Sequence, residues 1–150
     1  MSENKFVTLA SKGEVVSGTT NSIQVRDFEP FFVDERKEIG GNNAGPNPLE
    51  YFLGSLGACT SVIATMIAKQ QDFSFGNLKF ETNGDLDPRG YQGVEGVQTY
   101  YQSVEVTVVM ETEESDEAFE NLANEVERRC PLFNLLKDAG VEVISNWEKK

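Results

Sequence analysis

Two cysteines are the residues in this chain that are best suited to chemistry. Cys59 lies in a run of small and apolar residues, and Cys130 lies directly before Pro131. The sequence contains no histidine, so no imidazole is available as a base, an acid or a metal ligand. One thiol can attack a peroxide and become a sulfenic acid, which a second thiol converts to a disulfide. Redox or nucleophilic chemistry in this chain therefore points first to these two thiols.

Each cysteine also has an ordinary structural interpretation. Cys59 falls on the apolar face of a predicted helix, where a lone cysteine is usually a small core residue. Cys130 stands at a possible N-cap, where the helix field and the adjacent Arg128 and Arg129 would favour its thiolate. Both arginines could instead end the preceding helix and point into water. The sequence leaves open whether the two sulfurs meet, since a disulfide needs Cα atoms within roughly 4.4–6.8 Å.

The composition predicts a globular protein with an acidic surface. A length of 150 residues suits one domain, residues 1–150. A net charge of −12 argues against binding nucleic acid or an anionic membrane through a broad basic face. Two cysteines without histidine are too few ligands for a structural zinc site.

The chain carries no recognisable targeting or membrane segment. No stretch approaches the roughly 18 consecutive apolar residues of a membrane span. Residues 1–16 lack the basic start and apolar middle of a secretory signal. We therefore expect a cytoplasmic protein, in which free thiols or a transient catalytic pair are favoured over a standing structural disulfide.

The helices that must position the two thiols can be predicted from hydrophobic periodicity. A loop over residues 35–48 precedes a long helix, capped by Asn47 and ending near Gln71, that carries Cys59. Small residues at positions 54, 55, 57 and 58 allow something to approach this helix closely. Ser115 is expected to cap a helix over residues 116–129, and Cys130 opens a short helix that ends at residue 140.

Short strands alternate with turn signals in the rest of the chain. They are predicted over residues 6–11, 14–18, 22–28 and 30–34, and then over 73–83, 98–112 and 141–147. The glycine-rich segment around residues 84–96 is predicted to be a long hairpin connection. This order of strands and helices predicts the α+β class.

The surroundings of both cysteines resemble motifs of a known family. GPNPLEYFLGSLGACTSV resembles the helix-opening motif of the OsmC/Ohr family of osmotically inducible and organic-hydroperoxide-resistance proteins. CPLFNLL resembles that family's second cysteine motif, and EIGG resembles its diglycine loop. The element order and the chain length match as well, so the resemblance covers nearly the whole chain.

The resemblance implies an OsmC-like α+β fold, with antiparallel sheets packed around a long central helix in an intertwined homodimer. It implies a thiol-dependent peroxidase that reduces organic hydroperoxides to alcohols in oxidative or osmotic stress defence. Cys59 matches the peroxidatic residue and Cys130 the resolving residue. The reductant would be a dithiol such as a protein-bound lipoyl group, and no metal, flavin, haem or other cofactor is expected.

The sequence departs from the family pattern in two respects, an acidic residue and an arginine. The glutamate that usually follows Asn-Pro is replaced by Leu49, and the nearest acid is Glu50, one position later. A shift of one residue turns a helical side chain by about 100°. The family's arginine cannot be matched by motif: Lys12 and Arg26 lie in the β region, and Arg36 lies in the loop before the diglycine. Glu50 and Arg36 are the candidates for supporting roles. The alternative function is a non-catalytic OsmC-fold binder of a small ligand or a thiol redox sensor.

Overall fold

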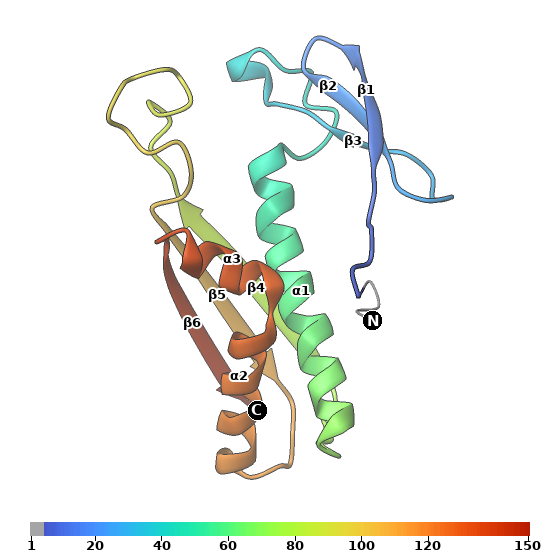
Figure 1. The fold of residues 1–150 in the computed structure, drawn as a ribbon, viewed down its shortest axis with the longest axis vertical. Coiled ribbons are helices and arrows are strands. Elements are labelled where there is room, and N and C mark those ends of the chain that lie inside the picture. Colours follow the sequence, from blue (N-terminus) through green and yellow to red (C-terminus); the bar gives the residue numbers. More distant parts are fainter. Residues whose placement is uncertain (1–4) are drawn as a thin grey trace. The chain divides into compact units, whose positions relative to one another are not determined.

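The computed structural model describes residues 5–150, so the first four residues of the N-terminal stretch lie outside the described residues. The chain divides into two compact units, Met1–Tyr51 and Phe52–Lys150. Each described unit contains a three-stranded sheet, and the long predicted helix is present (Figure 1). The α+β class is therefore confirmed, while the assignment of residues 1–150 to one domain stays a prediction.

The sheet of the first unit is antiparallel. It consists of β1 (Lys12–Ser17), β2 (Thr20–Gln24) and β3 (Phe31–Val33), in that order, and the 3₁₀ helix η1 (Lys37–Ile39) follows. The predicted strand over residues 6–11 is wrong, because these residues are not in a strand. Their apolar composition favours a strand, but composition does not determine which segments pair in a sheet.

A buried carboxylate, that of Asp34, organises the first unit. Its side chain is 1% exposed. The carboxylate accepts hydrogen bonds of 2.7–3.1 Å from two hydroxyl groups and three backbone N–H groups, which belong to Thr19, Thr20, Glu35, Asn42 and Ala44. A buried charge is tolerated when its hydrogen-bonding capacity is filled in this way. These bonds join the sheet to the loop that precedes the long helix.

The hydrogen bonds also decide the charge state of Asp34. Burial by itself raises the pKa of this carboxyl group. The bonds from Thr19, Thr20, Ala44 and Glu35 outweigh burial and hold the pKa well below its ordinary value of 3.8. Asp34 is therefore ionised at neutral pH and accepts from all five donors.

The sheet of the second unit contains both kinds of strand pairing. It consists of β4 (Leu78–Asp85), β5 (Ser103–Met110) and β6 (Glu142–Lys149). The antiparallel pairing of β4 with β5 confirms the predicted long hairpin connection. The prediction of purely antiparallel sheets is wrong, because β5 and β6 are parallel. Parallel neighbours require a crossover connection, and two helices form it.

The start of β4 also differs from the prediction. The strand begins at Leu78 rather than at residue 73. Phe73 instead belongs to the apolar core, and its N–H donates to the carbonyl oxygen of Ala68 just after the long helix. Residues 73–75 therefore continue the turn out of the helix rather than the sheet.

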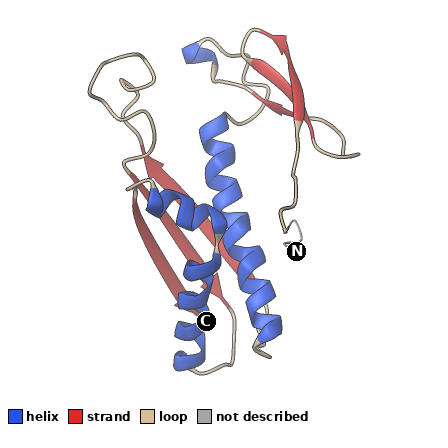
Figure 2. Ribbon diagram, viewed as in Figure 1, coloured by secondary structure: helices blue, strands red, loops and turns tan. Residues whose placement is uncertain are grey.

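Three helices cover one face of this sheet (Figure 2). They are α1 (Pro48–Gln70), α2 (Asp116–Arg129) and α3 (Pro131–Asp138). The predicted cap of α2 is confirmed, because Ser115 Oγ accepts a hydrogen bond from the Ala118 N–H at 3.1 Å. Every second residue of β5 is buried, as expected for a sheet with one covered face. The core cluster consists of Ala64, Ile67, Ala68, Phe73, Met110, Phe119, Leu122 and Val126.

The small residues of α1 let it approach β4 closely, as predicted. A Cβ atom at Gly57 would overlap the ring of Phe80 on β4. One turn earlier, the Thr82 hydroxyl donates to the Leu53 carbonyl oxygen at 3.0 Å. These contacts hold the segment of α1 that carries Cys59 against the sheet.

By length and composition alone, α1 could cross a membrane. It has 23 residues, and its most apolar window has a mean hydropathy of 1.6. A count of uninterrupted apolar residues does not detect this property, because it ignores mean hydropathy. It is weak evidence of a membrane span, because core helices pass the same test and Ala64, Ile67 and Ala68 of α1 lie in the core cluster.

We expect Asp34→Asn to lower the thermal stability of the protein at neutral pH. An amide has no charge, and its NH₂ group would face N–H and O–H donors in either orientation. Because the folded-state pKa is lowered, the stabilisation is present above the ordinary pKa and is lost as pH falls through the folded value. The difference from wild type should therefore shrink in acid. Thermal unfolding followed by circular dichroism at neutral and acidic pH measures this, and exposed Asp27→Asn is the control. An equal midpoint for the two variants at neutral pH contradicts the prediction.

Candidate active site

The two cysteine sulfurs are in contact within the second unit. Cys130 Sγ lies 3.4 Å from Cys59 Sγ, within hydrogen-bonding distance for two sulfurs. Both thiols are free, Cys59 half-buried and Cys130 buried. The question that the sequence left open, whether the sulfurs meet, is answered by this distance. A disulfide of about 2.05 Å requires only a small closing movement.

The backbone of Cys130 belongs to two helices at once. Its N–H donates to the Val126 carbonyl oxygen at 2.8 Å and closes α2, while its own carbonyl oxygen accepts the Asn134 N–H at 3.1 Å and opens α3. Cys130 is the N-cap of α3, as predicted, but its side chain makes no capping hydrogen bond. The sulfur points instead to Cys59.

The groups around Cys59 shift the pKa of its thiol in opposite directions. Burial raises the pKa of the Cys59 thiol, and the hydrogen bond and charge of Cys130 raise it further. The backbone N–H of Leu132 donates to Cys59 and lowers the pKa, and the net shift is upward. Pro131 has no N–H, so Leu132 supplies the first N–H of α3. The sequence does not indicate this contact between the Leu132 N–H and the thiol.

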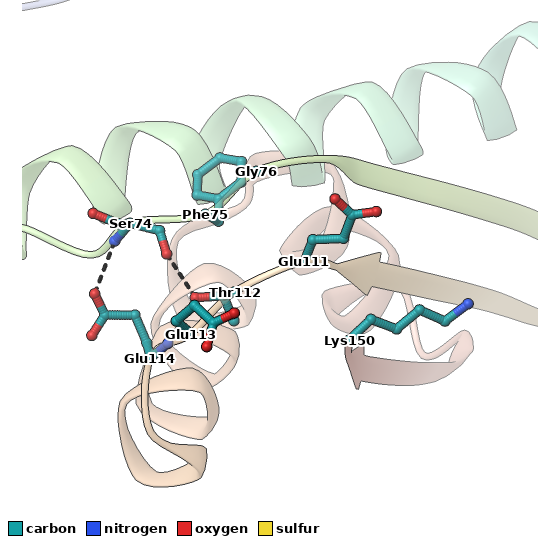
Figure 3. Close-up of a pocket in the computed structure, with 8 residues that line it drawn as sticks. All are labelled: Ser74, Phe75, Gly76, Glu111, Thr112, Glu113, Glu114 and Lys150. Carbon is teal, nitrogen blue, oxygen red and sulfur yellow. Dashed lines mark hydrogen bonds between the residues drawn. The ribbon is translucent and has the colours of Figure 1, made fainter.

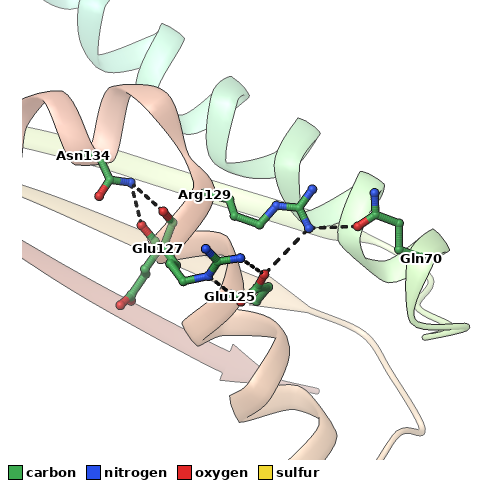
Figure 4. A network of polar contacts seen from close by, with 6 residues as sticks. Gln70, Glu125, Glu127, Arg129 and Asn134 are labelled. Atoms are coloured by element: carbon green, nitrogen blue, oxygen red, sulfur yellow. Dashed lines mark hydrogen bonds and ion pairs between the residues drawn. The ribbon is translucent and has the colours of Figure 1, made fainter.

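The two arginines before Cys130 bond to groups other than sulfur, and Figure 4 labels Arg129 with its partners Gln70 and Glu125. Arg128 Nη2 pairs with Glu125 Oε1 at 2.5 Å. Arg129 Nη1 donates to Gln70 Oε1 at 2.8 Å and lies 3.8 Å from the Glu125 carboxylate. These arginines therefore end α2 rather than stabilise a thiolate at Cys130. Arg129 also joins α2 to Gln70, the last residue of α1.

Glu50 and Arg36 form a second pair, within the first unit. Arg36 Nη2 lies 3.2 Å from Glu50 Oε1, and both side chains are exposed. The Glu50 N–H donates to Asn47 Oδ1 at 2.8 Å, and the Asn47 N–H donates to Glu50 Oε2 at 3.3 Å. This reciprocal arrangement is a capping box. The predicted cap by Asn47 is confirmed, and Glu50 is its partner.

Sequence reasoning missed Asp34, Leu132 and Asn134. Asp34 follows a strand with no motif around it, and Leu132 acts through its backbone. Asn134 lies four residues after Cys130, one helical turn on, and that spacing was the available signal. Its side-chain amide contacts carbonyl groups at the junction of α2 and α3.

A pocket of about 370 Å³ lies elsewhere in the second unit (Figure 3). Glu111, Glu113, Glu114 and Lys150 contribute to its lining, and neither cysteine does. Its walls are joined by the bond from the Ser74 N–H to Glu114 Oε1 at 3.1 Å. The described residues contain no group of three or more acidic, cysteine or histidine side chains suited to holding a metal ion.

Solved structures with a similar fold cover almost the whole chain. An OsmC-like protein from Mycoplasma pneumoniae has a TM-score of 0.82 at 15% identity, covering 95% of this chain and 97% of its own. An organic hydroperoxide resistance protein from Elizabethkingia anophelis has a TM-score of 0.76 at 17% identity, covering 99% and 100%. The organic hydroperoxide resistance protein OsmC of Legionella pneumophila has a TM-score of 0.70 at 17% identity, covering 97% and 99%.

Sequence comparison identifies the family directly. No curated protein matches the chain significantly in sequence. The sequence profile of OsmC-like proteins matches residues 40–146, a range that includes both cysteines and spans more than half of the chain. Together with the shared fold, this match shows that the chain belongs to the OsmC-like protein family.

Proposed function

We propose that this protein is a cysteine-based peroxidase that reduces organic hydroperoxides to alcohols in stress defence. The observation that carries the proposal is the 3.4 Å contact between the Cys59 and Cys130 sulfurs. Family membership supports it, as do the Elizabethkingia and Legionella proteins of similar fold, which are named organic hydroperoxide resistance proteins.

Burial distinguishes the proposed roles of the two thiols. Cys59 is partly exposed, so a peroxide from solution can reach its sulfur. Cys130 is 1% exposed and is suited to react with a group already on Cys59. The Leu132 N–H that donates to Cys59 favours negative charge on that sulfur, since it belongs to the first turn of α3.

The reaction balances with the two thiols and one hydroperoxide. The Cys59 thiolate attacks the terminal peroxide oxygen, the O–O bond breaks, and the alkoxide takes a proton to leave as an alcohol. The resulting sulfenic acid is attacked by the Cys130 thiolate, which forms the disulfide and releases hydroxide, protonated to water. A dithiol reductant, for example a protein-bound lipoyl group, then restores both thiols by two exchange steps and becomes a disulfide.

We also propose that the protein acts as a cytoplasmic homodimer. The first unit exposes large apolar side chains, including Val15 at 64% and Phe32 at 46%. On α1, Val62 and Met66 are also about half exposed, at 55% and 48%. Large exposed apolar side chains are suited to association with another chain.

Glu50 and Arg36 are proposed to support the site by ordering the start of α1. The capping box places the Glu50 carboxylate on the first turn, and Arg36 holds its other oxygen. An exposed ion pair contributes about 0–1 kcal/mol, so the cap is the larger effect.

A thiol redox sensor is the second candidate function. The raised pKa of Cys59, caused mainly by burial, favours it, because a protonated thiol reacts slowly with peroxide. A sensor would form the disulfide once and remain oxidised, whereas a peroxidase would turn over with a dithiol.

Peroxide consumption by the reduced protein with dithiothreitol tests the peroxidase. We expect wild type to consume cumene hydroperoxide repeatedly, and Cys59→Ser to fall to the background rate because the attacking sulfur is gone. Cys130→Ser should retain sulfenic acid formation but lose rapid disulfide closure, which intact mass analysis with a sulfenic acid trap detects. Equal, slow consumption by wild type and Cys59→Ser would remove the proposal, and a single turnover by wild type favours the sensor.

The Cys59 thiol should titrate above its ordinary pKa of 9.0, because burial and Cys130 both disfavour the thiolate. Cys130→Ala removes the neighbouring thiol and should lower the Cys59 pKa. The pH dependence of Cys59 alkylation by iodoacetamide, followed by mass spectrometry, measures both values. Exposed Lys137→Ala on α3 is the control, and an unchanged or higher midpoint in Cys130→Ala contradicts the expectation.

Substitutions at Glu50 separate a capping role from a charged catalytic role. Glutamine also completes a capping box, so Glu50→Gln should keep most of the peroxidase activity and stability. Glu50→Ala removes the hydrogen bond from the Asn47 N–H and should cost about 0.5–1.5 kcal/mol of stability. Chemical denaturation and cumene hydroperoxide kinetics measure these effects, with Arg36→Ala as the variant that loses only the ion pair. A strong loss of activity in a stable Glu50→Gln protein would assign the carboxylate to catalysis instead.

A further inference from the structure

The junction that carries Cys130 is closed by the side-chain amide of Asn134 (Figure 4). Asn134 Nδ2 lies 2.9 Å from the carbonyl oxygen of Glu127, 3.2 Å from that of Arg128 and 2.8 Å from that of Cys130. The amide nitrogen has two protons for these three acceptors, so two of the contacts share one proton. One side chain therefore binds the backbone on both sides of the junction.

Helix geometry explains why these carbonyl groups are available. The last four carbonyl groups of a helix have no partner within it. In α2 the Cys130 N–H satisfies Val126, and Asn134 satisfies Glu127 and Arg128. An unpaired carbonyl group in a partly buried turn costs free energy. The turn is thus held in the conformation in which Asn134 can reach all three oxygens.

The helices on either side of the junction are held by other contacts. Arg129 joins the end of α2 to Gln70, the last residue of α1, at 2.8 Å. Apolar residues of α1 and α2 share the core cluster. With α1 and α2 already fixed to one another, the conformation of the turn at Cys130 decides where its sulfur lies relative to Cys59.

We propose that Asn134 is a positioning residue that holds Cys130 within reach of Cys59 for disulfide closure. Asn134 acts through the backbone of Cys130, and its amide bonds to carbonyl oxygens rather than to sulfur. The inference deepens the proposed function and rests on its pairing of Cys59 with Cys130. In the step concerned, the Cys130 thiolate attacks the Cys59 sulfenic acid, the S–S bond forms, and the S–O bond breaks to release water after protonation.

The physical effect is on the effective concentration of one thiol at the other. Two reacting groups held in contact react as if each were present at very high concentration. Motion of one group away from the other lowers this effective concentration. Loss of the Asn134 bonds lets the turn sample conformations in which the sulfurs are apart. Both the rate of closure and the equilibrium constant of the disulfide then fall.

The full-length protein equilibrated in glutathione buffers tests the proposal. The variants are Asn134→Asp, which replaces the donor with acceptors at nearly constant size, and Asn134→Gln, which keeps an amide. Asn124→Asp, the same change at an exposed position of α2, is the matched control. We expect the disulfide equilibrium constant to fall roughly tenfold in Asn134→Asp, to be intermediate in Asn134→Gln, and to stay at the wild-type value in Asn124→Asp.

The proposal is overturned if folded Asn134→Asp has the same disulfide equilibrium constant as Asn124→Asp. Circular dichroism verifies the fold, and if Asn134→Asp does not fold, the same comparison is made with Asn134→Ser, which retains one hydroxyl donor. The glutathione equilibrium requires no peroxide. Failure of wild type to consume cumene hydroperoxide would therefore overturn the proposed peroxidase function, while the equilibrium constants still decide the role of Asn134.

Discussion

The parallel pairing of β5 with β6 is the constraint on which the thiol pair depends. Parallel neighbours cannot be joined by a tight turn, so the chain between these strands crosses the sheet as α2 and α3. The break between the two helices falls at Cys130, whose backbone serves both. Because α1 lies on the same face of the sheet, held closely at Gly57, the crossover brings Cys130 to Cys59. If a tight hairpin replaced the crossover helices, Cys130 would not be brought to Cys59.

The electrostatic surroundings of this pair come from backbone groups more than from charged side chains. The protein has no histidine, and Arg128 and Arg129 bond to Glu125 and Gln70. Burial raises the pKa of Cys59, and the Leu132 N–H opposes that effect. The contact between the two sulfurs and the start of α3 both follow from the conformation of the turn at Cys130. The carbonyl groups of that turn are the ones that Asn134 binds.

Hydrogen bonds to polar groups also order the first unit. Its described residues bury little beyond Thr20, Val33 and Asp34, so an apolar core contributes little to its order. The Asp34 carboxylate gathers five donors from the strands and the loop, and the loop leads into the capping box formed by Asn47 and Glu50. The buried Asp34 carboxylate and the cap at Asn47 thus hold the loop that leads into α1.

The sequence by itself determined the helices, their caps and the two residues that carry the candidate chemistry. Periodicity, Asn47, Ser115 and the Cys-Pro pair act over a few neighbouring residues, and such local preferences can be read directly. Strand partners cannot be read in this way, because pairing joins residues far apart in the chain. Composition therefore predicts a strand over residues 6–11 where none forms, and it carries no information on the direction of β6. The meeting of the two sulfurs, the five donors around Asp34 and the amide of Asn134 at the helix junction were decided by the tertiary structure, since each depends on how separate segments pack together.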